Sequence, residues 1–268
     1  VAGTTDPWNE LMRRVRRNPS DPANYAAVLE LLDPVNLADY MIANMYAGNI
    51  DWQDNNSYAM RNRAGDGRFR FSSWDAEETF LSPGDNTSTQ NVSNTATELF
   101  TRLRANDEFR LLFADRLQRH YFDGGALSPE IAESRWLEMA VWIDRAVVGE
   151  SARWGDLMRP SRPYTRDIDW VKEIENIRSS YIGAGRSSNR TTATFSQFAR
   201  LKLYPDLSPP AISDPAGGVV EESHVVRLEN PEGQEATLYF TTDGTDPRDP
   251  GGKVSATSQI FSGGVVSN

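Results

Sequence analysis

The sequence predicts an α+β chain, in which a mainly α-helical domain with one small β-hairpin is followed by a partial β-sandwich domain. Three observations support this fold class. Apolar residues recur at helical spacing in several segments up to Tyr181, whereas one short stretch around residues 57–72 alternates with period two. After Tyr204 the helical periodicity stops and short strand-like runs replace it. We therefore place the domains at residues 1–204 and 205–268.

The composition limits the classes of function. With 268 residues, 38% of them hydrophobic, the chain can build one sizeable core and a smaller second one. A formal net charge of -10 disfavours binding to nucleic acid or anionic lipid. No apolar run approaches the roughly 20 residues that cross a bilayer, so we expect no membrane span. The absence of cysteine excludes disulfides and thiolate metal sites. Because the N-terminus carries no signal-peptide pattern, we expect any signal sequence to lie outside this chain.

Three helices are expected first, over residues 7–17, 24–32 and 35–47. Asp33 and Pro34 precede the third helix, where an aspartate can cap the free amides and a proline fits the first turn. Gly48 and Asn49 follow it, and both residue types tolerate the left-handed conformation found after a helix. The third helix is therefore expected to end at Ala47 and to lead into a polar loop over residues 50–56.

A β-hairpin is expected next, because residues 57–61 and 68–72 alternate on either side of the glycine-containing turn at 64–67. Its second strand leads to Trp74 and Asp75. Residues 82–94 are small and polar, with too little apolar surface to offset the entropy of ordering them. We therefore expect a mobile loop there.

Four further helices are expected over residues 95–105, 107–122, 129–149 and 167–181. Trp136, Trp142, Trp154 and Trp170 fall at positions that suit helix packing, and we assign them to the core. After Pro205, Pro209 and Pro210, residues 225–228, 237–241 and 259–261 have the pattern of short strands. These are fewer than the roughly seven strands of a complete fibronectin-like sandwich, so the second domain is expected to be truncated.

The polar residues of two loops suggest chemistry. Asp51 follows the end of a helix, Asn56 comes five positions later, and Asp75 follows the hairpin. A kinase catalytic loop and its metal-binding aspartate have this order of residues. Phosphoryl transfer needs a carboxylate to accept the proton of the attacking hydroxyl and hard oxygen ligands for magnesium. On spacing alone, the alternative that these are ordinary turn residues is equally favoured.

The wider stretch resembles the spore-coat protein H (CotH) kinase family. The resemblance covers about residues 7–204 and rests on a helix that ends in Gly-Asn-x-Asp-Trp, an asparagine, a hairpin and Trp-Asp. The matching residues are Gly48, Asn49, Asp51, Trp52, Asn56, Tyr58, Trp74 and Asp75, with Arg153 and Trp154 further on.

This resemblance implies a kinase-like C-lobe with ATP and Mg²⁺ or Mn²⁺ as cofactors. It implies Asp51 as the catalytic aspartate, and Asn56 and Asp75 as the residues that bind the metal and the nucleotide. The family commonly has a second aspartate two positions after Asp75, and this chain has Glu77 there. A longer carboxylate can still reach magnesium, so Glu77 is a further candidate metal ligand.

A kinase also needs a lysine and a loop over the nucleotide phosphates ahead of the catalytic aspartate. The first lysine of this chain is Lys172, and residues 1–50 contain no glycine-rich loop. We therefore expect the nucleotide-clamping lobe to be missing from this chain and the fragment alone to be inactive. Whether the whole protein is an active kinase or a pseudokinase stays open.

The second domain resembles the C-terminal domain of chitobiases and β-hexosaminidases through residues 239–247, Tyr-Phe-Thr-Thr-Asp-Gly-Thr-Asp-Pro, which are similar to that family's Tyr-x-Thr-Asp-Gly-x-x-Pro motif. In that family the Asp and Gly of the pattern are mostly structural. The resemblance implies an appendage of a secreted bacterial enzyme, without glycosidase chemistry.

Three functions remain open at this point. The first is a magnesium-dependent protein kinase that phosphorylates Ser or Thr of a secreted or surface protein in a bacterium. The second is a noncatalytic surface or adhesion protein, in which the kinase-like fold is a scaffold and the β domain contacts carbohydrate or the cell wall. The third is transfer of another group, such as AMP or an amino acid.

Overall fold

The structure is a computed structural model, and it describes residues 4–53, 55–212, 219, 221, 224–263 and 265–266. The chain divides into two compact units, Val1–Tyr204 and Pro205–Asn268, which are described separately. None of the helices in the described ranges combines the length and the apolar character that a membrane span requires.

Three helices begin the first unit: α1 (Asp6–Val15), α2 (Pro22–Leu29) and α3 (Pro34–Ala47). The second and third have a proline in the first turn, and a preceding aspartate caps each of them. Asp33 accepts a hydrogen bond from the main-chain amide of Asn36 at 3.0 Å. Gly48 ends α3 in the left-handed conformation, with φ of 63°. The structure thus confirms the sequence-based boundaries of α3.

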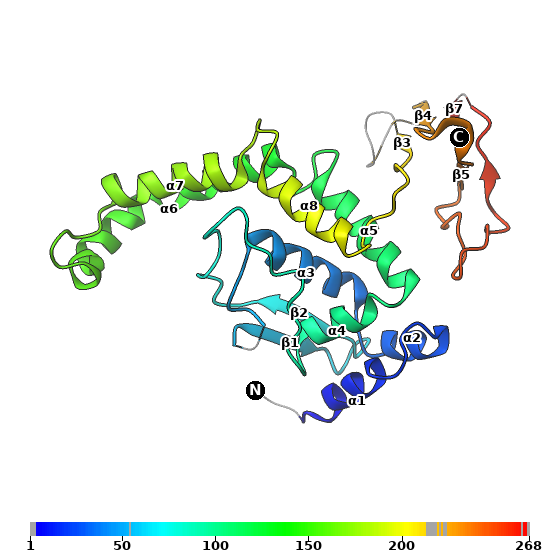
Figure 1. Cartoon of the computed structure of the whole chain (residues 1–268), viewed down its shortest axis with the longest axis horizontal. Coiled ribbons are helices and arrows are strands. Elements are labelled where there is room, and N and C mark those ends of the chain that lie inside the picture. The colour runs from blue at the N-terminus through cyan, green and yellow to red at the C-terminus, as the bar shows by residue number, and fades with distance from the viewer. Residues whose placement is uncertain are drawn as a thin grey trace. The chain divides into compact units, whose positions relative to one another are not determined.

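The hairpin pairs β1 (Ser57–Arg61) with β2 (Phe69–Ser73) in antiparallel register, and Ser57 lies opposite Ser73. It packs on α3 through its second strand, because Phe69 and Phe71 are buried whereas most of β1 is exposed. The side chain of Asn36 fixes this contact, since it accepts from the main-chain amide of Phe71 at 2.6 Å and donates to its carbonyl at 3.3 Å. The residues on either side of the hairpin are therefore held at one end of α3 (Figure 1).

The loop at residues 82–94 is packed against the body of the first unit, which corrects the expectation of a mobile loop. Thr87 and Ser88 are buried. Side chains from elsewhere in the chain donate to the loop's main-chain carbonyls, for example Arg190 to Pro83 and Asp85 at 2.8 Å. Short polar side chains order the loop through hydrogen bonds where apolar burial would be insufficient.

The helices after the loop are α4 (Ala96–Leu103), α5 (Asp107–Tyr121) and α6 (Pro129–Met158). A segment with π-helical ends follows, comprising η1 (Arg166–Trp170), α7 (Val171–Asn176) and η2 (Ile177–Ile182), and then α8 (Arg190–Arg200). Helix α6 continues past the predicted end at Gly149, and α8 was not predicted. A capping box starts α8, in which Asn189 and Thr192 each bond the other's main-chain amide.

Helix α6 and the η1–α7–η2 segment run side by side and project from the other helices of the unit as an arm (Figure 1). The assignment of all four tryptophans to the core is wrong for two of them. Trp142 is 82% exposed and Trp154 is 41% exposed. Trp136 is partly buried, with its ring 5.6 Å from that of Phe80. The prediction of helices in this part of the chain is confirmed, but the arm has too few neighbouring elements to cover its apolar residues.

The second unit contains short strands. An antiparallel three-stranded sheet has the order β3 (Ala211–Ile212), β4 (Val226–Glu229) and β7 (Val265–Val266). A separate pair joins β5 (Tyr239–Phe240) to β6 (Gln259–Ile260), and the 3₁₀ turn η3 (Gly233–Glu235) precedes β5. The α+β fold class is confirmed for the chain. Two sheets packed as a sandwich are not shown among the described residues, so the β-sandwich remains a prediction.

Glu98, on α4, is the charged centre of a contact between α4, the end of α1 and the loop before α4. Its carboxylate is 6% exposed and accepts from Arg16 at 2.7 and 2.9 Å, Arg102 at 2.7 Å and the main-chain amide of Asn94 at 2.7 Å. These donors, the Arg16 guanidinium above all, lower the pKa of Glu98 from 4.5 to about 2.

We expect Glu98 to make the first unit acid-sensitive. Because its pKa is lower in the folded chain, the stabilisation is fully present above about pH 4.5 and is lost as the pH falls towards 2. A shift of this size corresponds to about 3 kcal/mol. Glu98→Gln should lower the urea midpoint at pH 7 and reduce its fall between pH 4.5 and 2.5. An unchanged pH profile in the variant would show that other carboxyl groups control acid unfolding.

Candidate functional site

The loop that carries Asp51 begins at a crowded helix end. A Cβ atom at Gly48 would lie 2.9 Å from the hydroxyl of Tyr181 and 3.4 Å from the guanidinium of Arg190. Together with its positive φ, this crowding restricts the position to glycine. The backbone conformation of Gly48 therefore fixes the direction in which the chain leaves α3.

Two buried asparagines then set the position of Asp51. Asn44 donates to the carbonyl of Tyr40 at 2.9 Å and to the hydroxyl of Ser73 at 3.1 Å, which ties α3 to the end of β2. Asn49 donates to the side-chain oxygen of Asn44 at 3.1 Å and accepts from the main-chain amide of Asp51 at 3.1 Å. This series of hydrogen bonds couples the end of the hairpin to the backbone of Asp51.

The structure brings Asp51 and Asn56 into direct contact. One carboxylate oxygen of Asp51 accepts from the side-chain amide of Asn56 at 3.0 Å, and the other accepts from that of Asn55 at 3.1 Å. Asp51 is partly exposed. A carboxylate has about four acceptor positions, so the two amides orient it and leave capacity for a further donor. Because Asn56 donates through its nitrogen, its amide oxygen remains available as a ligand.

Trp52 anchors the middle of the loop. Its indole is 1% exposed, lies 5.4 Å from the ring of Tyr40 and donates to the side chain of Gln90 at 3.1 Å. The packed 82–94 loop thus supports the Asp51 loop from beneath. The buried aromatic ring, next to the partly exposed carboxylate of Asp51, holds the polar loop in one conformation.

Arg190 holds both loops and the end of α3. Its guanidinium, on α8, is fully buried and donates to the carbonyls of Met45 at 2.5 Å, Tyr46 at 2.7 Å, and Pro83 and Asp85 at 2.8 Å. The first two are carbonyls of the last turn of α3, where the helix dipole favours a cation.

Tyr181 provides a second donor to the same helix end. Its hydroxyl donates to the carbonyl of Tyr46 at 2.7 Å. Burial raises the pKa of Tyr181, so the phenol keeps the proton that this bond requires. Its ring also lies 5.1 Å from the Arg190 guanidinium carbon. The end of α3 that leads to Asp51 is therefore bonded from two later segments of the chain.

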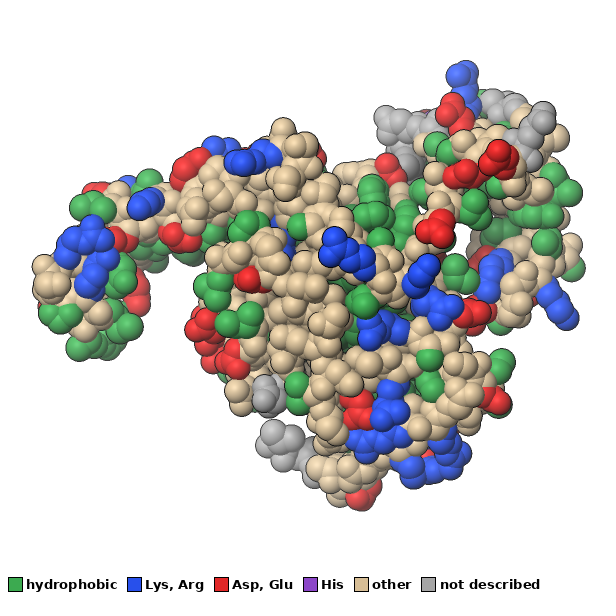
Figure 2. Space-filling model, in the orientation of Figure 1, with side chains coloured by type: hydrophobic (Ala, Val, Ile, Leu, Met, Phe, Trp, Pro, Cys, Tyr) green, Lys and Arg blue, Asp and Glu red, His purple; other side chains and the backbone are tan. Residues whose placement is uncertain are grey.

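Asp75 and Glu77 lie after β2 and are exposed. Asp75 has a left-handed backbone, with φ of 48°, which bends the chain directly after the strand. Two main-chain hydrogen bonds join the segment to α3 and to the loop after it. The amide of Phe80 donates to the carbonyl of Ala47, and the amide of Ile50 donates to the carbonyl of Glu78. Figure 2 shows acidic side chains gathered along this edge of the first unit. Both loops of the candidate site therefore lie at one end of the hairpin, and Trp74 and Tyr58 pack edge to face there.

The model of the CotH kinase protein family matches residues 3–182, about two thirds of the chain. The chain belongs to the CotH kinase family. No curated protein and no solved structure matches it significantly. The family match covers Asp51, Asn56, Asp75 and Glu77, and it does not extend to the second unit, where the chitobiase-like resemblance remains unsupported.

The side chains of the CotH kinase motif include oxygen donors that could hold a metal ion. The candidate ligands Asn56, Asp75 and Glu77 offer amide and carboxylate oxygens, which suit Mg²⁺ or Mn²⁺. Within the described ranges, no group of three acidic, histidine or cysteine side chains forms a metal-binding cluster. The donor set fits a magnesium ion that takes one or two protein carboxylates and completes its shell with phosphate oxygens and water.

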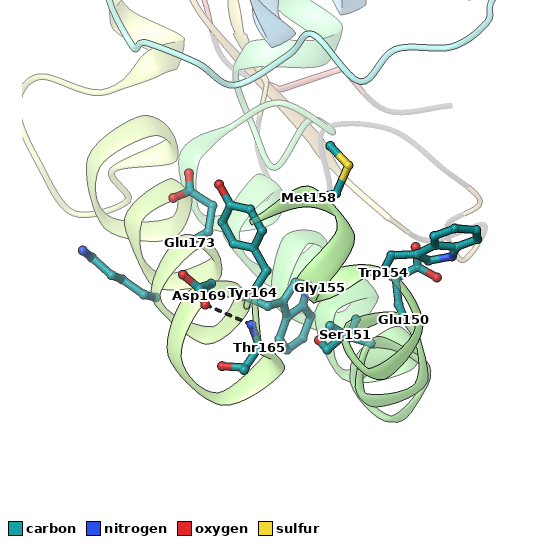
Figure 3. A pocket seen from close by; sticks show the side chains of 12 residues that line it. Glu150, Ser151, Trp154, Gly155, Met158, Tyr164, Thr165, Asp169 and Glu173 are labelled. Carbon is teal, nitrogen blue, oxygen red and sulfur yellow. Dashed lines mark hydrogen bonds between the residues drawn. The ribbon is translucent and has the colours of Figure 1, made fainter. Parts of the chain in front are cut away.

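A cavity of about 500 Å³ lies elsewhere, between the C-terminal part of α6 and the η1–α7 segment (Figure 3). Trp154, Met158, Tyr164 and Trp170 line it, whereas the candidate site residues Asp51, Asn56, Asp75 and Glu77 do not. Asp169 at its edge accepts from the main-chain amide of Thr165 at 2.9 Å. The cavity therefore belongs to the arm and not to the Asp51 loop.

Sequence reasoning missed the supporting residues Arg190, Asn44 and Gln90. Asn44 lies in the motif stretch, five residues before Asn49, and that spacing is a signal for the helix-end contact. The pattern Asn189-x-x-Thr192 signals the start of α8 and would have placed Arg190 in its first turn. No local pattern shows that this arginine is buried, because all four acceptor carbonyls are distant in the sequence.

We expect Arg190→Met to destabilise the first unit by about 3 kcal/mol, because it removes the buried donor that four main-chain carbonyls share. The urea midpoint should fall, and limited proteolysis should cut within residues 82–94. Arg200→Met, at an exposed position on the same helix, is the matched control and should leave both unchanged. Equal behaviour of the two variants would contradict the role given to Arg190.

Proposed function

We propose that the chain carries the catalytic loop of an atypical protein kinase of CotH type. In the whole protein, phosphate would pass from ATP to Ser or Thr hydroxyls of a secreted or surface protein of a bacterium. The observation that carries this proposal is the Asp51 carboxylate, held by Asn55 and Asn56 at 3.1 and 3.0 Å in a loop of CotH kinase sequence.

Asp51 is suited to act on an acceptor hydroxyl. Two amides fix the plane of its carboxylate, and its partial exposure leaves an acceptor position open to an incoming hydroxyl group. A carboxylate in that position orients the nucleophile and receives its proton as the phosphorus–oxygen bond forms. The five-residue spacing to Asn56 equals that between the aspartate and asparagine of a kinase catalytic loop.

Asn56, Asp75 and Glu77 would hold Mg²⁺ or Mn²⁺ beside the nucleotide phosphates. When bound, the ion would neutralise charge on the transferred phosphoryl group. Support comes from position and chemistry: Asn56 and Asp75 flank the two strands of one hairpin, and the exposed carboxylates of Asp75 and Glu77 add negative charge at the same edge. For the second unit we propose a structural spacer, with contact to carbohydrate or the cell wall as the alternative.

The proposal is tested by transfer of labelled phosphate from ATP in the natural full-length protein, with Mg²⁺ or Mn²⁺. Asp51→Asn keeps the shape of the side chain and removes the proton acceptor, so the rate should fall by about 10²- to 10⁴-fold. Asp75→Ala should abolish metal-dependent nucleotide binding as well as transfer. Binding of a fluorescent ATP analogue separates the two defects, because Asp51→Asn should still bind.

Glu78→Gln is the control, since Glu78 is an exposed neighbour whose main chain supports the loop. It should retain transfer and binding. No transfer by the folded wild type, with nucleotide binding intact, would indicate transfer of another group. Loss of both would favour the noncatalytic scaffold.

A further inference from the structure

Helix α6 exposes most of its length. It has 30 residues, or about 45 Å, and only Ala140 and Gly155 are buried. A helix that packs on a core normally covers a continuous apolar stripe. The arm therefore presents apolar surface that the described residues of this chain do not cover, and Figure 2 shows apolar side chains along it.

Two faces of α6 differ in their surroundings. One face lies against the η1–α7 segment. Ser151 and Gly155 of this face line the cavity described above, and Ala140 and Asp144 line a second cavity of about 380 Å³ between the same elements. The opposite face carries Met139, Trp142, Ile143 and Ala146, which are at positions i, i+3, i+4 and i+7. A helix places residues at these spacings on one stripe.

This outer stripe is strongly exposed. Met139 is 52% exposed, Trp142 82% and Ile143 45%. A tryptophan so exposed in the middle of a helix loses the stabilisation that burial of its indole would give. Trp142 and Ile143 lie near the centre of α6, which begins at Pro129 and ends at Met158.

One pair of charges at the ends of the stripe is arranged symmetrically about that centre with opposite sign. Arg135 lies seven positions before Trp142, and Glu150 lies seven positions after Ile143. Both are exposed.

We propose that the outer stripe of α6 binds a second copy of this chain, with the two α6 helices antiparallel across a two-fold axis. In that arrangement, Trp142 of each chain packs beside Ile143 of the other, and Met139 packs beside Ala146. Arg135 of each chain meets Glu150 of the other. An isologous contact requires such a self-complementary patch, and a partner of other sequence would not need charges of opposite sign at equal distances from the centre.

The first experiment measures molar mass against concentration by sedimentation equilibrium of the full chain. The wild type is expected to dimerise. Trp142→Asp should raise the dissociation constant at least about tenfold, because a central buried tryptophan dominates such contacts. Val148→Ser is the matched control: it removes a side chain that is 56% exposed on the other face of α6 and should leave the constant unchanged.

The charge pairs allow a test that unfolding cannot imitate. Arg135→Glu and Glu150→Arg should each weaken self-association, because like charges then meet twice across the axis. A mixture of these two variants should form a heterodimer, since opposite charges meet again in both pairs, and the double variant should dimerise with itself. A wild type that stays monomeric up to about 100 μM, or a dimer that survives Trp142→Asp, would overturn the proposal.

Discussion

The buried guanidinium of Arg190 is the interaction on which the rest of the first unit depends. A charge placed inside a protein is costly unless every donor is bonded, and this one is matched by four main-chain carbonyls rather than by a carboxylate. Two of these carbonyls end α3, and the other two belong to the polar 82–94 loop. One side chain thus satisfies a helix end and orders a loop that could not order itself by apolar burial.

This arrangement explains how an exposed polar loop can be held in place. Asp51 lies only a few residues after the helix end that Arg190 and Tyr181 bond, and Asn49 continues the hydrogen bonding to its main chain. The loop is supported on its other side by Trp52, whose indole reaches Gln90. A carboxylate on a loop is placed accurately only where hydrogen bonds and packing of this kind support the loop, because an unsupported loop samples many conformations.

Much of the first unit could be predicted from local signals. Asp33-Pro34 and Gly48 set the limits of α3, and strand alternation about a glycine turn gave the hairpin, because these features act within a few residues. The errors arose where distant parts of the chain decide. The order of residues 82–94 depends on Arg190, more than a hundred positions away, and the exposure of Trp142 depends on what packs against α6. The Asp51–Asn56 contact was within reach of sequence reasoning, since its spacing is local.

The distance along the chain between Arg190 and its acceptors has a consequence for synthesis. The carbonyls of Met45 and Tyr46 leave the ribosome 144 or 145 residues before the arginine that bonds them. Contacts between such distant residues form late, since a long stretch of chain must close before they contribute. Helix α3 and the hairpin can therefore fold early, whereas the Asp51 loop reaches its final geometry only after α8 has emerged. Until then, the nascent chain carries the motif without its support.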